Sequence, residues 1–484
     1  MQVMTDAKKI APAQLPRIAI LGGGPAGLGA AWRLAREKKA IVDLFEAGAR
    51  LGGNAGSFDA DGIHCDFGSH RLHPASAPAI LEDIKSILGD DLLLHPRHGR
   101  IRLKGSWIHF PLKPLDLALR LPPLFAVSLF LDAATAKLRA PKPEVVTFGS
   151  VLLGGLGRTM CESFYFPYMK KLWGLGPDEL APTLAKRRVS GSSLPKLMRK
   201  IFTSLPGLKS PTTGKFYYPR GGFGRICDGI GGAAQKSGAN ISTNARVEGI
   251  EIVNNRLRSV TIRRGESLER FEADAVWSTL PLTTLVRAAG GEAPKIVRDA
   301  ADAIRYRGML LVYIILDTDQ YTEFDAHYFP ELSTPISRLS EPKNYYAGHE
   351  PRGRTVLCAE LPSDPGDQYW SMDDESLGKA LYQWLGDCGL PQSAKIIRAF
   401  TRRLPHAYPV YDRNYEMYFK IIDEWISKIE GLLTFGRQGL FAHDNTHHAL
   451  AMAYAAADCL ENGIFDHEKW RQYREEFLTH VVED

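Results

Sequence analysis

Residues 17–53 read RIAILGGGPAGLGAAWRLAREKKAIVDLFEAGARLGG. The apolar run at residues 18–21 has the length of a buried parallel strand, and a glycine-rich turn follows it at once. Residues 26–36 carry apolar side chains at helical spacing, and residues 41–45 form a second short apolar run. The order strand, glycine turn, helix, strand predicts a βαβ unit that binds a dinucleotide.

Each glycine of the motif Gly22-x-Gly24-x-x-Gly27 has its own task. Gly22 permits the tight turn, Gly24 lets the backbone approach a pyrophosphate, and Gly27 lets the helix pack closely on the strand. The N-terminus of the helix offers N–H groups and a positive dipole end to phosphates. Glu46 closes the second strand, where a carboxylate accepts hydrogen bonds from ribose hydroxyls. The dinucleotide contacts expected from this unit are Gly22, Gly24, Pro25, Ala26, Gly27, Glu46 and Ala47.

A second glycine pair, Gly52-Gly53, begins six residues after Glu46. An acid followed at this distance by Gly-Gly resembles the two-dinucleotide-binding-domain flavoproteins of the amine oxidase superfamily. The dinucleotide of that superfamily is FAD, so the resemblance implies an FAD cofactor, with NAD as the alternative. A second glycine turn also brings further backbone N–H groups near the diphosphate.

The composition is that of an ordinary globular protein, with 44% hydrophobic and 24% charged residues. A chain of 484 residues is too long for one simple core, so we expect two or three lobes. The net charge of +5, from 60 basic and 55 acidic residues, fits an anionic small-molecule substrate but no nucleic-acid partner. Six scattered cysteines without a CxxC pair predict reduced thiols in a cytoplasmic protein rather than a disulfide frame or a zinc site.

We predict an α/β fold around a Rossmann-like FAD-binding domain that is discontinuous in the sequence. The expected extents are a flexible tail at 1–14, the FAD-binding domain at 15–100, 215–285 and 400–484, a helical insertion at 101–214, and an antiparallel-sheet substrate lobe at 286–399. The apolar run at residues 121–131 is too short to span a bilayer. It predicts either a buried helix or a helix that dips into a membrane face, which would make the protein peripherally membrane-associated.

Three further segments resemble segments of the superfamily that contact the cofactor. The loop at residues 62–71 is dense in small and polar residues, which suits a backbone that lies against a flat ligand. The contacts implied by the resemblance are Gly68, Ser69 and His70 at the isoalloxazine, Val247 at the adenine, and Gly436 and Arg437 at the closing turn. Judged from its residue type alone, without the resemblance, His70 is either a structural hydrogen-bonding group or a catalytic base.

Two other segments resemble UDP-galactopyranose mutase and its relatives. The first is a helix that ends in Lys-x-x-Trp-Gly before a basic segment; there, the family places Trp173 by the nucleotide base and Arg188 on the substrate diphosphate. The second is Tyr-Phe-Pro-Glu, whose Tyr328 precedes Arg338 by ten residues, as it does before a diphosphate-binding arginine in eukaryotic-type mutases. The resemblance therefore implies that Arg188, Arg338 and Tyr328 act with His70 in catalysis. From the residues alone, the alternatives are a core tryptophan, a packed tyrosine and solvated arginines.

The resemblance to the mutases breaks at residues 441–448, which read FAHDNTHH. By position, His443 and Asp444 replace tyrosines that lie against the substrate diphosphate in the mutases, so we assign both to substrate binding. Three histidines and an aspartate within six residues are also ligand types for a metal. No i, i+4 pair is set against a distant third ligand, so we expect no metal.

Two functions follow from these resemblances. In the first, reduced flavin attacks the anomeric carbon of a diphosphate-linked sugar, a sugar nucleotide or polyprenyl-linked sugar, in redox-neutral chemistry of polysaccharide biosynthesis. In the second, an oxidoreductase of the protoporphyrinogen oxidase or carotenoid desaturase type takes a hydride from an apolar substrate. The paired Tyr328 and Arg338 favour the first, and residues 121–131 favour the second. A non-enzymatic flavin-binding scaffold is a third possibility for which no residue argues.

Overall fold

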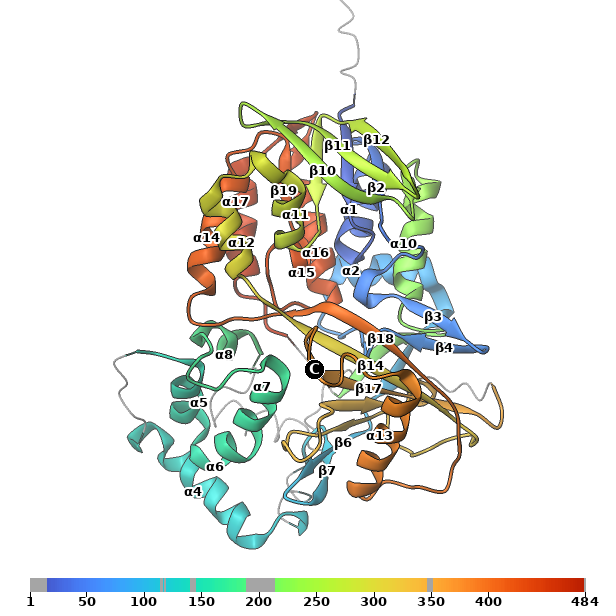
Figure 1. Cartoon of the computed structure of the whole chain (residues 1–484), viewed down its shortest axis with the longest axis vertical. Coiled ribbons are helices and arrows are strands. Elements are labelled where there is room, and N and C mark those ends of the chain that lie inside the picture. Colours follow the sequence, from blue (N-terminus) through green and yellow to red (C-terminus); the bar gives the residue numbers. More distant parts are fainter. Residues whose placement is uncertain are drawn as a thin grey trace, which may run out of the picture.

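The structure is a computed structural model that describes residues 15–113, 116, 119–139, 145–188, 214–345 and 351–482. The tail expected at residues 1–14 and part of the expected helical insertion, residues 189–213, lie outside these residues. Figure 1 shows a parallel sheet with its helices at the top, a second large sheet below it, and a group of helices on the lower left.

The upper part is built on a five-stranded sheet in the order β19-β13-β1-β2-β9, in which every neighbouring pair is parallel. Its strands are β1 (Arg17–Leu21), β2 (Ile41–Phe45), β9 (Asn240–Ser242), β13 (Ala275–Ser278) and β19 (Leu432–Thr434). The covering helices include α1 (Pro25–Arg36), α10 (Arg225–Lys236) and α16 (Thr446–Asp458). Four residues of β1 and four of β2 are buried, as expected for strands covered on both faces. The strands come from the start, middle and end of the chain, so the predicted discontinuous dinucleotide-binding domain is confirmed.

A smaller antiparallel sheet and several helices extend this upper part (Figure 1). They are β10 (Arg246–Val253), β11 (Arg256–Arg264), β12 (Ser267–Glu272), α11 (Leu282–Ala289), α12 (Lys295–Ala303), α14 (Tyr415–Ile426) and α17 (His467–Phe477). The remaining elements near the first domain are β3 (Ser57–Ala60), β4 (Ile63–Asp66), α2 (Pro78–Leu88), β5 (Leu92–Pro96), β8 (Lys215–Pro219), α15 (Gly436–Gly439), β20 (Leu460–Glu461) and β21 (Ile464–Phe465).

The lower part is a seven-stranded sheet in the order β18-β14-β17-β16-β15-β6-β7. All neighbours in it are antiparallel except β15 and β6. Its elements are β6 (Gly99–Leu103), β7 (Ser106–Phe110), β14 (Tyr306–Leu316), β15 (Ala326–Tyr328), β16 (Arg338–Ser340), β17 (Thr355–Pro362) and β18 (Ile396–Pro409), with α13 (Asp374–Asp387) on one face. The antiparallel substrate-lobe sheet is present as predicted.

The expected start of this lobe at residue 286 is wrong, because residues 286–303 lie in the end of α11 and in α12 and pack in the core of the upper part. Two strands also lie outside their expected domains. Residues 101–110, expected in the helical insertion, lie in β6 and β7, and residues 400–409, expected in the FAD-binding domain, lie in β18. Both differences have one cause: these strands find their hydrogen-bond partners far away in the chain, β6 on β15 and β18 on β14. Such pairing leaves no local sequence pattern that assigns a strand to one sheet rather than another.

The helices on the lower left of Figure 1 form the described part of the insertion. They are α4 (Pro123–Arg139), α5 (Phe148–Leu156), α6 (Arg158–Met160), the π-helical turn η3 (Cys161–Tyr165), α7 (Phe166–Trp173) and α8 (Pro182–Arg188). In α4, Leu124, Val127 and Leu131 are 84%, 56% and 60% exposed, so the buried-helix alternative for residues 121–131 is wrong. Among the described helices, none has the length and apolar character needed to cross a membrane.

Candidate active site

The glycine turn between β1 and α1 has the geometry that its sequence predicts. Gly22 has a φ of +105°, and its N–H donates to the Phe45 carbonyl over 2.9 Å. A Cβ on Gly27 would lie 1.9 Å from the Gly22 carbonyl oxygen, so only glycine fits there. A Cβ on Gly24 would meet no atom within 4 Å. Gly24 therefore borders open space at the start of α1, where a phosphate can approach the first-turn N–H groups.

The second glycine pair lies against the first. Gly52 donates its N–H to the Gly23 carbonyl over 2.8 Å, and a Cβ on Gly53 would lie 3.6 Å from the Gly24 Cα. Glu46 accepts hydrogen bonds from the N–H groups of Gly23 (2.8 Å) and Gly48 (2.7 Å). A carboxylate has further lone pairs, so these bonds leave Glu46 able to accept a ribose hydroxyl as well. We call these two glycine turns with Glu46 the cradle, and its residues fit a dinucleotide.

One cavity of about 410 Å³ runs from the cradle to the seven-stranded sheet. That volume lies in the usual range for ligand sites. The expected site residues that line it are Gly22, Gly24, Pro25, Ala26, Glu46, Gly53, Ser69, His70, Arg188, Arg338, Gly436, Arg437 and Asp444. Those that do not line it are Gly27, Ala47, Gly52, Gly68, Trp173, Val247, Tyr328 and His443. Gly27 and Gly52 shape the cradle from behind, and Val247 lies on β10, outside the cavity.

On the side of the seven-stranded sheet, Arg338 is held by a buried acid. Its Nε and Nη2 both donate to one oxygen of Glu360, over 3.0 and 2.7 Å, and Glu360 is 5% exposed. The same oxygen accepts the Ser69 N–H over 2.9 Å. This bond joins the loop that contains Ser69 to the Arg338–Glu360 pair. Tyr328 is the register partner of Arg338, and its buried hydroxyl has no hydrogen-bond partner in the described part of the chain. We call Arg338, Tyr328 and Glu360 the sheet wall.

Two arginines of the cavity were missed by the sequence analysis. Arg71 is buried, donates to Asp325 over 3.2 Å, and lies over the ring of Tyr345, 4.9 Å from its centroid. Arg97 follows β5 and also lines the cavity. Neither was assigned a role from the sequence: Arg71 lies in the loop between β4 and α2, and Arg97 lies between β5 and β6, which belong to different sheets. Arg71 directly follows the predicted Gly68-Ser69-His70 contacts, which was the one available signal.

His70 lines the cavity but makes a structural hydrogen bond. Its Nε2 donates to the Phe67 carbonyl over 2.9 Å, and its ring stacks on Phe223 with the centroids 5.3 Å apart. Burial lowers the pKa of His70, while the nearby Asp66 opposes that shift. The neutral ring therefore keeps Nδ1 as its hydrogen-bond acceptor, and the interpretation as a hydrogen-bonding group describes the observed contacts.

On the opposite side, Arg188 at the end of α8 lies over two aromatic rings. Its Cζ is 5.4 Å from the centroid of Trp173 and 5.6 Å from that of Tyr408. Trp173 is buried, and its Nε1 donates to the Pro409 carbonyl over 3.3 Å. Arg437 lies over the other end of this group, 5.1 Å from Tyr408, and donates to the Asp444 and Ala407 carbonyls. We call Arg188, Trp173, Tyr408 and Arg437 the helical wall. Trp173 supports Arg188 from behind rather than lining the cavity.

The segment that departs from the mutases lies beside the helical wall. His443 is buried edge-on against Trp173, with the centroids 5.4 Å apart, and neither ring nitrogen has a hydrogen-bond partner in the described residues. Burial first, and then the charges of Arg188 and Arg437, lower the pKa of His443 well below its usual range. His443 is therefore neutral and packs behind the wall, whereas Asp444 reaches the cavity.

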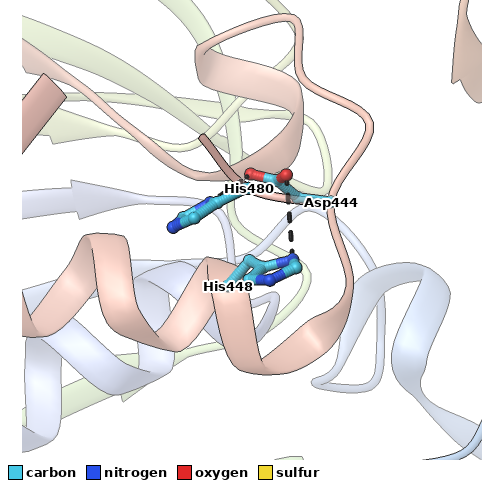
Figure 2. Close-up of side chains that lie close together, drawn as sticks. All are labelled: Asp444, His448 and His480. Atoms are coloured by element: carbon cyan, nitrogen blue, oxygen red, sulfur yellow. Dashed lines mark hydrogen bonds and ion pairs between the residues drawn. The ribbon is translucent and has the colours of Figure 1, made fainter. Parts of the chain in front are cut away.

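Figure 2 shows Asp444 with two histidines that pack on each other. His480 Nδ1 lies 3.2 Å from one Asp444 oxygen, and His448 Nδ1 lies 3.8 Å from the other. The two rings stack at 4.2 Å with an angle of 15°. Rings that are nearly parallel share no in-plane point for a metal, and His448 Nδ1 already accepts the N–H of Asn445 as the capping group of α16. One hydrogen bond, between His480 and Asp444, joins the group, and the other Asp444 oxygen has no hydrogen-bond partner among the described residues. The three residues form an i, i+4 pair with a distant third residue, with one ligand atom of each within 4.8 Å of the others, an arrangement that the sequence pattern did not reveal. Val482, two residues after His480, lines the cavity.

Comparison with known proteins agrees with this geometry. Residues 25–398 match the model of the family described as flavin containing amine oxidoreductase. The fold is similar to that of reduced UDP-galactopyranose mutase, with a TM-score of 0.80 and 21% identity over 97% of this chain and 100% of that one. It is also similar to a putative protoporphyrinogen oxidase from Exiguobacterium (TM-score 0.67, 19% identity, 92% and 98% coverage) and to putrescine oxidase bound to putrescine (0.60, 15%, 92% and 99%). Together with the cradle, the family match shows that the protein is an FAD-dependent enzyme that belongs to the flavin-containing amine oxidoreductases.

Proposed function

We propose that this flavoenzyme acts on a diphosphate-linked sugar, either a sugar nucleotide or a polyprenyl-linked sugar, by mutase-like chemistry with reduced flavin. One observation carries the proposal: the cavity beside the cradle is lined by the five arginines Arg71, Arg97, Arg188, Arg338 and Arg437. The cradle meets the pyrophosphate of FAD with backbone N–H groups, so side-chain cations on both walls point to a second anionic ligand. The same charges oppose a cationic amine substrate.

The two walls offer complementary groups to a diphosphate. Arg188 and Arg338 carry planar guanidinium forks that can each donate paired hydrogen bonds to phosphate oxygens. Glu360 orients the fork of Arg338, and Tyr328 packs beside it behind the cavity surface. When bound, FAD in its reduced form supplies the reactive ring. The residues of this chain then bind the diphosphate, exclude water and neutralise the charge of the leaving group.

The test measures binding and electron balance together. Dithionite-reduced enzyme is incubated under anaerobic conditions with a panel of sugar nucleotides and polyprenyl-diphosphate sugars. We expect one compound class to be isomerised with no net oxidation of the flavin, and UDP or a polyprenyl diphosphate to inhibit. If each active compound is instead oxidised in step with flavin reduction, the mutase-like proposal is wrong.

An oxidoreductase acting on an apolar substrate is the second candidate, favoured by the exposed leucine and valine side chains of α4. Such a face suits peripheral contact with a lipid surface, from which an apolar or polyprenyl-linked substrate would be drawn. Flotation with phosphatidylcholine vesicles tests the contact, with Leu124→Glu/Leu131→Glu as the variant and Leu268→Glu, an exposed leucine on β12, as the control. Hydrogen peroxide release under oxygen with an apolar substrate would support the oxidoreductase.

A further inference from the structure

Lys171, in the last turn of α7, is a buried lysine whose three donors all have acceptors. The side chain is 8% exposed. Its Nζ lies 2.5 Å from the Phe329 carbonyl oxygen, 2.6 Å from that of Glu331, and 3.0 Å from that of Ile336. An ammonium carries three N–H donors and no acceptor, so the three carbonyls satisfy it completely. Among the described residues, no carboxylate oxygen lies within 4.0 Å of Nζ.

A buried cation without a paired anion is an unfavourable choice for packing alone. Taking an ammonium out of water is costly, and burial lowers the pKa of Lys171 to about 7. Opposing that shift are Cys388 and Glu331, the titratable groups that face it. A methionine or leucine would fill the same space without this cost. The arrangement therefore indicates that the three hydrogen bonds themselves are required.

The three carbonyls belong to the connection between β15 and β16. This connection, residues 329–337, begins after Tyr328 and ends before Arg338, which pair with each other across the two strands. The N–H of Phe329 closes it by donating to the Ser337 carbonyl over 3.0 Å. Lys171 thus fixes the segment that leads from Tyr328 to Arg338, the cavity-lining arginine of the sheet wall.

The same helix turn also carries the helical wall. Trp173 follows Lys171 by two residues, so the two side chains leave α7 on different faces. Trp173 is anchored by its hydrogen bond to the Pro409 carbonyl, and its ring supports the Arg188 guanidinium. One turn of α7 is therefore bonded to the sheet wall through Lys171 and to the helical wall through Trp173.

We propose that Lys171 is a positioning residue that sets the separation of the two walls, so that Arg188 and Arg338 bind the same diphosphate. The proposal rests on the proposed function for the identity of the ligand. It adds a residue that touches neither substrate nor FAD and that acts through residues 329–337.

Three variants separate this role from general packing. Lys171→Met keeps an unbranched side chain one atom shorter and removes all donors, whereas Lys171→Arg keeps the charge but cannot direct three donors at three convergent carbonyls. Lys170→Met is the matched control, because Lys170 is its exposed neighbour on the same helix. Neither Lys170 nor Lys171 lines the FAD cavity, so flavin content should equal that of the wild type.

Two measurements follow on the FAD-loaded proteins. Amide hydrogen exchange should become faster in residues 329–337 of both Lys171 variants, with β17 and the Lys170→Met control unchanged. Affinity for UDP should fall about 10-fold or more, because a displacement on the order of 1 Å is enough to break a bidentate contact. Apparent KM for a substrate identified above should rise more than kcat falls.

The outcomes distinguish the two proposals. Unchanged exchange of residues 329–337 in a folded Lys171→Arg or Lys171→Met protein would overturn the positioning role. If the wild type binds UDP, faster exchange of residues 329–337 in the Lys171 variants together with wild-type UDP affinity would overturn it too. If the wild type binds neither UDP nor a polyprenyl diphosphate, the proposed function fails, and the exchange data alone then decide whether Lys171 holds the segment.

Discussion

The cradle and the two walls line one cavity but are built on different principles. The cradle consists of backbone: Gly22, Gly24 and Gly53 present N–H groups and open space, and they lie within 32 positions of one another in the chain. The walls consist of side chains: Arg188 and Arg338 are 150 positions apart and come from a helix and a strand. A backbone site depends on a short local motif, whereas a side-chain site depends on long-range packing. Substitutions should therefore affect the two regions separately.

The largest effect should come from the cradle. Gly24 has a φ of −78°, which valine adopts without strain, so Gly24→Val should fold. Its side chain would occupy the open space that the pyrophosphate needs, and the purified protein should be largely colourless. Flavin absorbance per chain measures this. Gly291→Val, at another glycine with open space but away from the cavity, should stay yellow. Full flavin occupancy in Gly24→Val would contradict the cradle assignment.

The next largest effect should come from Arg338 in the sheet wall. Arg338→Ala removes a charge-assisted donor pair, so UDP affinity should fall about 10- to 150-fold, which corresponds to roughly 1.5–3 kcal/mol. It also leaves Glu360 buried without its cation, so the free energy of unfolding should fall by about 3–5 kcal/mol. Flavin content should not change.

A second substitution separates the two consequences. Arg338→Ala/Glu360→Gln removes the uncompensated carboxylate and should recover much of the lost stability without recovering UDP affinity. Isothermal titration and thermal unfolding measure the two quantities. Recovery of affinity in the double variant would mean that Arg338 only balances Glu360 and does not bind the diphosphate.

Arg188 should show the affinity effect without the stability effect. It contacts the rings of Trp173 and Tyr408 and has no carboxylate partner among the described residues. Arg188→Ala should therefore weaken UDP binding by about 10- to 150-fold while the melting temperature changes little. Arg188→Lys should restore only part of the affinity, since an ammonium lacks the planar fork. Equal affinity in the wild type and Arg188→Ala would remove the helical wall from the proposed diphosphate site.

The smallest effect should be a change in pH dependence beside the helical wall. Burial lowers the pKa of His448 to about 4, although the carboxylate of Asp444 opposes the shift. The unfolded chain binds the proton below about pH 6.5, so stability should fall as the pH drops from about 6.5 to 4, by at most about 1.4 kcal/mol per unit for this histidine. His448→Gln should flatten the slope while keeping a capping side chain at this position of α16.

Urea unfolding at several pH values gives the slope. His447, whose pKa burial lowers to about 3, should retain its own share in the variant. His467→Gln, at an exposed position of α17, serves as the control for the substitution itself. An equal slope in His448→Gln and the wild type would show that His448 titrates alike in the folded and unfolded chains.

The sequence by itself determined the cradle and the discontinuous dinucleotide-binding domain. Gly22, Gly27 and Gly52 are needed for reasons of backbone conformation and close approach, which act within a few residues and leave a readable motif. Arg188 and Arg338 were identified through resemblance alone, because nothing in their neighbouring residues sets them apart from solvated arginines.

Only the tertiary structure decided which side chains share the cavity and which residues support them. Glu360 lies in a stretch without a motif, and Arg71 and Lys171 lie in segments whose pattern gives them no role. Their partners are separated from them by 22, 254 and at least 158 positions. The exposure of α4 and the membership of β18 in the lower sheet were likewise decided by what packs beside them. Burial and hydrogen-bond pairing are properties of two segments at once, so neither segment encodes them alone.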